Sequence, residues 1–340
     1  MKAFINAIIV VLLSFACSFG AQAGVLDASV VVEDRSQRVR AMAVTQAFEQ
    51  VIRSRTGSTS VLAEPLERLL ANSAQFVDNY AYSTTDEGLT QLDIRFQEQK
   101  LRQAVMAAQI SYWPDQRPKT LVLLAQVTTT NRAPHYVADA DEALLASMAA
   151  AFDQYDLTMI TPIWDLDDRL IASPQQIWDQ DRERAVEMAD KYGASCVLMG
   201  AAYFDSRARY RINWTLDCAG ELVRRQLGAL DVEGAANQGR NLVVGQLVAQ
   251  QAVDLSGSAQ SLLVEVAGLE TYSSVVLLRN YLDELLQVQS YNIQSISAAG
   301  LQLELNLVDD ITKFRQRLTR DGMLQRIDDE HYQWVAVNVE

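Results

Sequence analysis

The sequence contains very little histidine and none of the glycine-rich patterns that hold nucleotides. The 340 residues include only two histidines, His135 and His331. These are too few to favour a histidine-based catalytic triad or metal cluster. The sequence has no Gly-x-Gly pair, no Gly-x-x-x-x-Gly-Lys run and no Gly-x-Ser-x-Gly elbow, the usual signatures of nucleotide cradles and of the hydrolase nucleophile. We therefore predict no cofactor, and the sequence identifies no enzymatic activity.

Positive charge is also scarce. The chain has 29 Lys and Arg against 43 Asp and Glu, and removal of residues 1–23, which include one Lys, leaves a net charge of −15. Phosphate backbones and anionic headgroups repel such a chain, so we predict no nucleic-acid partner and no adhesion to anionic membranes. The hydrophobic content of 49% is ordinary for a globular protein, and the length suggests two or three domains.

Only the N-terminus carries a long uncharged apolar run. Lys2 precedes the apolar stretch Phe4–Phe15, and the small residues of Ala21-Gln22-Ala23 follow. This is the layout of a cleavable secretory signal, whereas an uncleaved anchor needs about 20 apolar residues. We expect cleavage after Ala23, export to the periplasm, and a soluble mature chain without an integral membrane segment. Acylation of Cys17 is the minor alternative.

Two cysteines, Cys196 and Cys218, remain in the predicted mature chain. Cys196 begins the strand-like segment 196–204, and Cys218 directly follows the segment 209–217. A polar turn separates the two segments, which resemble a hairpin. With the turn centred near Ser206 and Arg207, cross-strand partners have residue numbers that sum to about 413, and those of the two cysteines sum to 414. We expect either a disulfide between them or two free buried thiols.

The pattern of apolar residues divides the mature chain into three parts. We predict an N-terminal α+β module over residues 24–112, a central α/β domain over 113–256 and a C-terminal α+β module over 257–340, with a linker at 255–258. Both terminal modules show the order β-α-β-β-α, which suits a small ferredoxin-like unit. Near-continuous apolar strands in the central part favour a buried, mostly parallel sheet.

Capping residues and spacing give the expected limits of several elements. A strand over 25–32 precedes a helix that begins at Asp34 or Ser36 and ends at Gly57. The parallel strands of the central domain are expected at 121–127, 157–161 and 196–204. Two short strands, 323–327 and 332–337, close the chain.

The strongest polar cluster contains Asp165, Asp167 and Asp168, followed by Arg169, at the carboxyl end of a predicted parallel strand. Ligands bind at such positions in open α/β sheets, and carboxylates there could hold Ca²⁺ or act as acid and base. The alternative, which we favour, is that one Asp caps a turn, another pairs with Arg169 and the rest are solvated. Ca²⁺ needs six or more oxygens, and no spaced loop pattern supplies them.

Three tryptophans lie within or just before the central domain. Trp113, Trp164 and Trp178 have an apolar body with a polar handle, a combination that often marks contact surfaces. Trp113 and Trp164 also adjoin prolines at element boundaries, so the interpretation we favour is that they close the ends of the sheet.

Three segments together resemble a known family: residues 111–118 leading into the strand at Leu121, then 161–168, then 191–200. With the N-terminal strand and helix that end near Gly57, the chain resembles an uncharacterised family of exported proteobacterial proteins, the domain-of-unknown-function family numbered 2066. A looser likeness is to the N-terminal domain of the translocation protein TolB and to flagellar outer-ring assembly proteins. The resemblance implies an envelope protein and brings no assigned catalytic residue.

Three classes of function follow. The first is a non-enzymatic envelope adaptor that docks on other envelope proteins, favoured by the modular architecture and the missing catalytic signatures. The second is a binder of a small ligand or cation in the cleft near Asp165. The third is a carboxylate-dependent hydrolase, for which the chain offers this Asp cluster together with Asp217 or Glu221.

Overall fold

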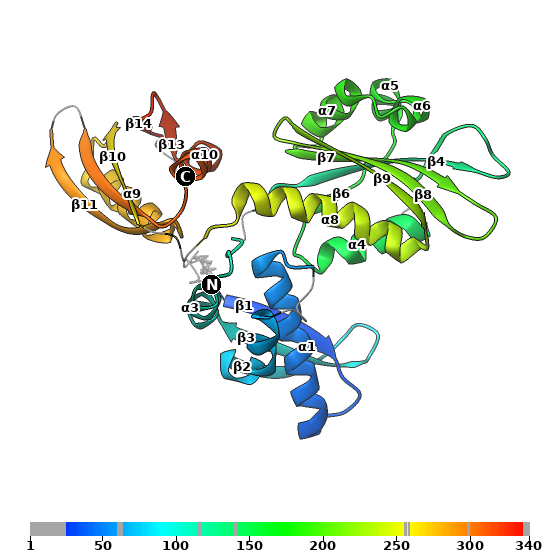
Figure 1. Ribbon diagram of the computed structural model, residues 1–340, viewed down its shortest axis with the longest axis horizontal. Helices are drawn as coiled ribbons and strands as arrows, with labels where there is room; N and C mark the ends of the chain where they lie inside the picture. The colour runs from blue at the N-terminus through cyan, green and yellow to red at the C-terminus, as the bar shows by residue number, and fades with distance from the viewer. Residues whose placement is uncertain are drawn as a thin grey trace, which may run out of the picture.

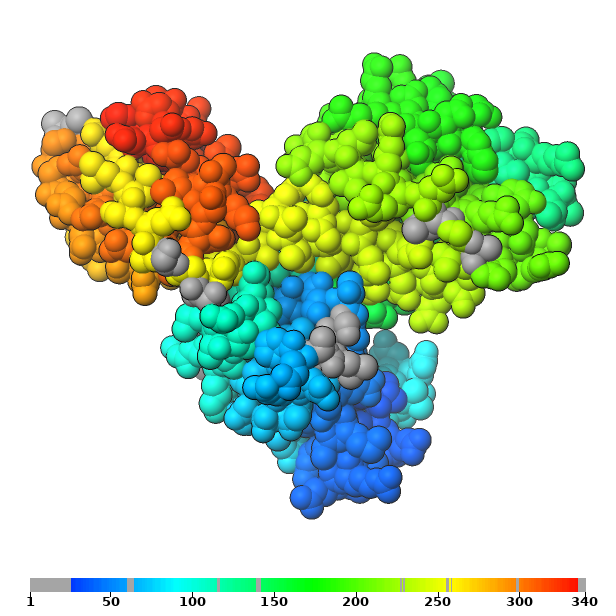
Figure 2. All heavy atoms as spheres, in the orientation of Figure 1, coloured from blue at the N-terminus to red at the C-terminus, as the bar shows by residue number. Residues whose placement is uncertain are grey.

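A computed structural model describes residues 25–59, 64–114, 117–138, 142–254, 257, 259–297 and 300–335. The predicted signal peptide, with Cys17 and Ala23, and most of the predicted linker lie outside these residues. The described part is a mixed α/β structure with three sheets and ten α-helices, and it forms three lobes in Figures 1 and 2. None of its helices combines the length and apolar content needed to cross a bilayer.

The N-terminal module has an antiparallel sheet in the order β1-β3-β2. Its strands are β1 (Val25–Val31), β2 (Val77–Thr84) and β3 (Thr90–Gln97). Its helices are α1 (Gln37–Thr56), α2 (Leu66–Ala71), a short 3₁₀ turn (Ser73–Phe76) and α3 (Glu98–Ala107). The Phe48 and Phe76 rings stack 4.7 Å apart in its core.

Helix α1 has the limits that the sequence predicts. The Ser36 hydroxyl accepts a hydrogen bond from the Val39 amide at the first turn, where helical N–H groups lack partners. Gly57 ends the helix with a φ of 65°, a left-handed conformation that glycine adopts without a Cβ clash.

The central sheet has the order β5-β4-β7-β8-β9, and β6 pairs with β4 beside this path. The strands are β4 (Thr120–Thr128), β5 (His135–Tyr136), β6 (Met159–Ile160), β7 (Cys196–Phe204), β8 (Tyr210–Cys218) and β9 (Glu221–Leu230). Among the described strands of this sheet only the β4–β6 and β4–β7 pairs are parallel, and they join the three strands that the sequence predicts to be parallel.

The prediction of a mostly parallel sheet is therefore wrong, because β5, β8 and β9 each pair antiparallel with a neighbour. β7 is apolar and buried over seven consecutive residues, yet this pattern depends on helices covering both faces of the sheet and not on strand direction. The tight turns after β7 and β8 return the chain directly beside itself, and such turns can join only antiparallel strands.

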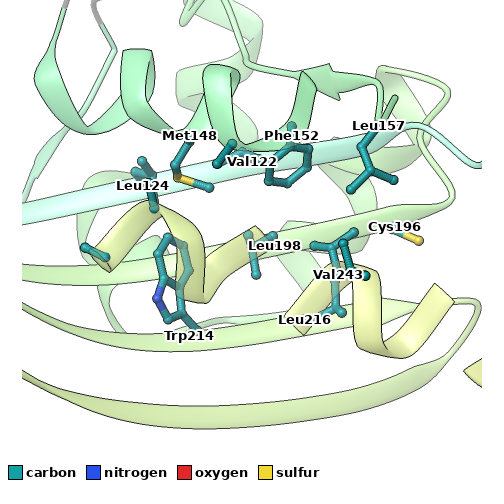
Figure 3. Packing of buried hydrophobic residues seen from close by; sticks show 14 of the residues in the cluster. Val122, Leu124, Met148, Phe152, Leu157, Cys196, Leu198, Trp214, Leu216 and Val243 are labelled. Carbon is teal, nitrogen blue, oxygen red and sulfur yellow. The ribbon is translucent and has the colours of Figure 1, made fainter. Parts of the chain in front are cut away.

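Helices cover both faces of the central sheet (Figure 1). They are α4 (Ala143–Asp153), α5 (Leu166–Ile171), α6 (Pro174–Trp178), α7 (Arg182–Lys191) and α8 (Val232–Gln251). α4 and α8 pack on one face, where Met148 and Phe152 of α4 meet Val122 of β4 and Trp214 of β8 (Figure 3). α6 and α7 pack on the other face.

The C-terminal module has a sheet in the order β11-β12-β10-β14-β13. Its elements are β10 (Gln260–Ala267), α9 (Tyr272–Glu284), β11 (Val288–Ile296), β12 (Leu301–Leu307), α10 (Ile311–Asp321), β13 (Leu324–Arg326) and β14 (His331–Trp334). The order β10-α9-β11-β12-α10 repeats the order β1-α1-β2-β3-α3 of the N-terminal module, apart from the short helical turns after α1.

The N-terminal and central modules meet at a buried arginine. The Arg117 guanidinium lies 3.9 Å from the Trp113 ring centroid and donates hydrogen bonds to the Ser54 and Tyr155 carbonyls, one from each module. Burial lowers the pKa of Arg117 to about 10. Nearby, the Tyr155 hydroxyl donates to the Ser58 carbonyl at 3.0 Å. These contacts connect α1 to the end of α4.

Candidate functional site

The predicted acidic cluster forms a turn that leads from β6 into α5, and we call residues 161–171 the α5 turn. Asp165 is the N-cap of α5, and its side chain accepts a hydrogen bond of 2.8 Å from the Asp168 amide. Trp164, directly before it, has a φ of 54°, a left-handed conformation that is unusual for a large residue. Asp165 therefore has the capping role that we favoured for one member of the cluster.

Asp168 is completely buried and fixes the turn through three hydrogen bonds. Its carboxylate accepts from the Trp164 amide at 2.9 Å, from the Tyr192 hydroxyl at 2.7 Å and from the Lys191 ammonium at 2.6 Å. The Tyr192 oxygen also accepts from the Ile163 amide at 3.1 Å. A buried carboxylate needs such partners, and together they tie both ends of the turn to the end of α7.

Lys191 joins the two carboxylates of the turn. Its ammonium lies 3.3 Å from Asp165 as well as 2.6 Å from Asp168. The hydrogen bond to Asp168 raises the pKa of Lys191. The hydrogen bond from the Asp168 amide lowers the pKa of Asp165, and Lys191 acts in the same direction. The cation that these two carboxylates contact is thus a lysine of the chain itself.

Arg169 does not pair with an aspartate of the cluster. Its Nε donates a hydrogen bond of 2.9 Å to the Trp164 carbonyl. Trp164 is itself only 5% exposed and stacks on Tyr136 at 4.0 Å. Trp113 is also buried, so both tryptophans that adjoin prolines pack inside the protein.

No metal centre is assembled among the residues that the structure describes. No three of their His, Cys, Asp or Glu side chains lie where they could hold one ion. Asp167 is exposed on the first turn of α5, while Asp165 and Asp168 turn towards Lys191. The side chains of the three predicted ligands therefore do not converge on one point.

The other carboxylates that we considered for hydrolysis lie elsewhere. Asp217 is buried and pairs with Arg182 at the start of α7, whereas Asp168 pairs with Lys191 at its end. At 1.5 Å per residue, these positions are about 14 Å apart along the helix axis. Glu221 accepts hydrogen bonds from Gln246 and Gln250 of α8. The structure does not bring these acids together.

The two cysteines lie directly opposite each other. Cys196 pairs with Cys218 in the β7–β8 register, so partner numbers sum to 414, close to the predicted value of about 413, and the expected pairing of the two residues is confirmed. In the structure their sulfurs are joined as a disulfide, and both residues are buried. Oxidation of the pair in cells stays a prediction.

The α5 turn also exposes three large apolar side chains that our sequence reasoning missed. Ile163, Leu166 and Leu170 are 78%, 74% and 76% exposed, and we call them the α5 surface. An apolar residue in an amphipathic helix is normally assigned to the core. The only signal in the sequence was the helical spacing. Leu166 and Leu170, four residues apart, share one face of a helix, and Ile171 lies on a different face, so the three cannot all point into the core.

Comparisons with known proteins give a family of unknown role. Residues 21–114 match the family described as a domain of unknown function (DUF8605). The match covers the predicted N-terminal module and differs from the family, numbered 2066, that the sequence resembles. No curated protein matches the chain.

Solved structures of the competence-damaged protein (CinA) superfamily show a weak similarity. A member from Escherichia coli is 13% identical with a TM-score of 0.24, and the match covers 44% of this chain and 85% of that protein. The protein from Enterobacter cloacae is 12% identical with a TM-score of 0.23, and the match covers 45% and 88%. At these TM-scores the similarity assigns neither a fold nor a function to this chain.

Proposed function

We propose that this protein is a non-enzymatic interaction or assembly adaptor of the bacterial periplasm, and that it docks on an envelope protein through the α5 surface. The observation that carries the proposal is the exposure of Ile163, Leu166 and Leu170, each more than 70%, within eight residues of sequence. Single exposed apolar residues are common on monomeric proteins, whereas several together mark contact sites.

The turn that presents this surface is fixed before any partner arrives. The buried Asp168 accepts hydrogen bonds from Trp164, Lys191 and Tyr192, and Tyr192 also accepts one from Ile163. A surface held in its binding conformation loses little conformational entropy on association. This supports docking over a purely structural role, because exposed leucine side chains do not stabilise the folded turn itself.

Charge indicates what the partner offers. Asp165, which pairs with Lys191, and Asp167 and Arg169 are exposed beside the apolar residues, and the whole chain has a net charge of −14. A matching partner presents an apolar patch bordered by Lys or Arg, since complementary potentials favour encounter and fix orientation.

The proposed location rests on the N-terminal layout and the cysteines. The segment from Met1 to Ala23 has the charge and apolar pattern of an export signal, and a paired Cys196 and Cys218 suit an oxidising compartment. The likeness to family 2066, TolB and flagellar outer-ring proteins belongs to this proposal. So does the ferredoxin-like interpretation of the terminal modules, which the strand order β1-β3-β2 supports.

Site-specific crosslinking in cells tests the adaptor role. A photoreactive amino acid replaces Leu166 in the tagged full chain, and we expect an adduct with one or a few envelope proteins. Leu170→Ser in the same chain reduces that adduct about tenfold, because contact residues of this size contribute on the order of 1–2 kcal/mol. The matched control places the same photoreactive group at Tyr272, which is 81% exposed in another module.

The outcome distinguishes docking from chance proximity. The same adducts from positions 166 and 272, or adducts that survive Leu170→Ser, would contradict docking through the α5 surface. Adducts with cytoplasmic proteins only would contradict the proposed compartment.

A further inference from the structure

Among the described residues, β1 has β3 on one side and no strand on the other, so its outer edge is unpaired there. We propose that this edge binds an extended, basic segment of another protein, which adds to the N-terminal sheet as a further strand. The proposal is independent of the α5 surface, which lies on another module.

The backbone groups that would bind such a segment can be named. The Val32 amide donates to the Thr90 carbonyl at 2.9 Å, and hydrogen-bonded pairs alternate in an antiparallel ladder. The amides and carbonyls of Leu26, Ala28 and Val30 therefore face β3, and those of Asp27, Ser29 and Val31 face outwards. An unpaired row of this kind is a template for strand addition.

Two hollows border this edge. One hollow of about 310 Å³ is lined by residues 26–29 of β1, by Val51 and Ser54 of α1 and by the end of α4. A second hollow of about 670 Å³ is lined by residues 30–34 and by Val39 and Met42 near the start of α1. The two hollows thus lie in sequence along the seam between β1 and α1, which pack against each other (Figure 1).

The C-terminal module shows how such an edge is filled. β10 stands in the position of β1, next to β12, and its other edge pairs with β14 in parallel. The Glu265 amide of β10 donates to the Glu330 carbonyl at 2.7 Å. In the C-terminal module, β14 therefore occupies the position beside β10 that corresponds to the open edge of β1.

The charge of the two hollows favours one kind of occupant. The charged residues that line them are Asp27, Glu33, Asp34, Asp153 and Asp156 against Arg38 and Arg55. Asp27 also pairs with Arg95 at 3.2 Å and Asp156 with Arg117 at 3.9 Å. Five acids against these four arginines leave a net negative charge, which favours a segment with Lys or Arg. They disfavour a second copy of this chain, whose β1 would bring the same acids.

The faces of the strand define the pattern of the segment. Leu26 and Val30 are buried towards α1, while Asp27 is on the outer face, where it pairs with Arg95 of β3 at 3.2 Å and keeps its side chain 63% exposed. A strand beside β1 places alternate side chains on these two faces. The matching segment therefore alternates apolar residues, which point towards α1, with basic residues on the side of Asp27.

A labelled peptide of alternating lysine and valine, about eight residues long as in an ordinary strand, is the probe. We expect it to bind the full chain in fluorescence anisotropy. Ser29→Pro removes one outward amide and blocks the edge, while edge strands tolerate proline on the solvent side, so binding weakens about tenfold or more. Ser29→Ala is the matched control, since it loses the same hydroxyl bond to Asp93 and keeps the amide. It binds within about twofold of the wild type.

A second peptide tests the main-chain contacts without changing the protein. N-methylation of alternate amides removes the donors on one edge of the peptide and keeps every charge. We expect the peptide methylated on the amides that face β1 to lose binding, and the peptide methylated on the opposite amides to keep it. This pair decides the matter even if the proline variant fails to fold.

Several results would overturn the proposal. They are a wild-type chain that does not bind the parent peptide, equal binding by both methylated peptides, and equal binding when glutamate replaces the peptide lysines. Self-association of the chain that Ser29→Pro abolishes would assign the edge to a second copy instead.

Discussion

The two terminal modules repeat one order of elements and differ in what lies beside their first strand. In the C-terminal module, β14 covers β10 and contributes Tyr332 and Trp334 to the core. In the N-terminal module, the described residues leave the same edge of β1 uncovered. The covered edge of β10 adds core contacts and so contributes to stability. The open edge of β1 keeps unpaired backbone groups, which we propose serve recognition of a partner.

The largest expected effect comes from breaking the covered edge. Trp334 is 4% exposed in the C-terminal core, and Trp334→Ala should lower the free energy of unfolding of this module by about 3–5 kcal/mol. Urea unfolding measures this loss. Hydrogen exchange should also show that the Glu265 amide, which donates to Glu330, loses its protection.

The open edge supplies the control for that experiment. Val31 is 53% exposed on β1, and Val31→Ala should change the free energy of unfolding by no more than about 0.5 kcal/mol. Similar losses for Trp334→Ala and Val31→Ala would show that the two edges do not differ in stability.

The cysteine pair gives an effect of intermediate size, confined to the central module. A disulfide between Cys196 and Cys218, 22 residues apart, should add about 3 kcal/mol in the chain-entropy account. The mature chain from cells should take up no alkyl groups without reductant and two after reduction, as measured by intact mass. Reduction should then destabilise the central module and leave the difference between β1 and β10 unchanged. Uptake of two alkyl groups without reductant would rule the bridge out.

Local signals in the sequence predicted most of the fold. The cap at Ser36 and the stop at Gly57 are short-range interactions, so the limits of α1 could be derived from neighbouring residues. The pairing of Cys196 with Cys218 followed from a turn whose length sets the register. The sequence also predicted the parallel direction of β4, β6 and β7 and the antiparallel hairpin of β7 and β8. The overall balance of the central sheet was misjudged, because burial on both faces gives parallel and antiparallel strands the same apolar pattern.

The candidate sites depend on contacts between distant segments. The sequence placed Asp168 in a polar cluster, yet its role comes from Lys191 and Tyr192, more than 20 residues away. Helix α5 has six residues, too few for hydrophobic periodicity to predict the helix or the exposure of its leucines. The open edge of β1 is equally invisible in the sequence, since it depends on which strands pair with β1 in the folded chain.

The smallest expected effect is a pH dependence of the covered edge. His331 lies in β14, and its Nδ1 is 2.8 Å from Asp328. The hydrogen bond to Asp328 raises the pKa of His331 above its ordinary 6.5. Hydrogen bonds from the Glu330 amide and from His331 lower the pKa of Asp328 to about 2, so this carboxylate is charged throughout the neutral range.

A raised histidine pKa stabilises the folded state only while the ring is protonated. The contribution is complete below about pH 6.5, the unfolded value, and is lost as the pH rises through the folded value. The urea midpoint of the C-terminal module should therefore be slightly higher at about pH 5.5 than at about pH 8.5, and His331→Gln should remove most of this slope. The N-terminal module has no histidine, so its midpoint should stay nearly constant over the same window. A midpoint that rises with pH, or a slope that survives His331→Gln, would show that the Asp328 contact does not help to hold β14 against β10.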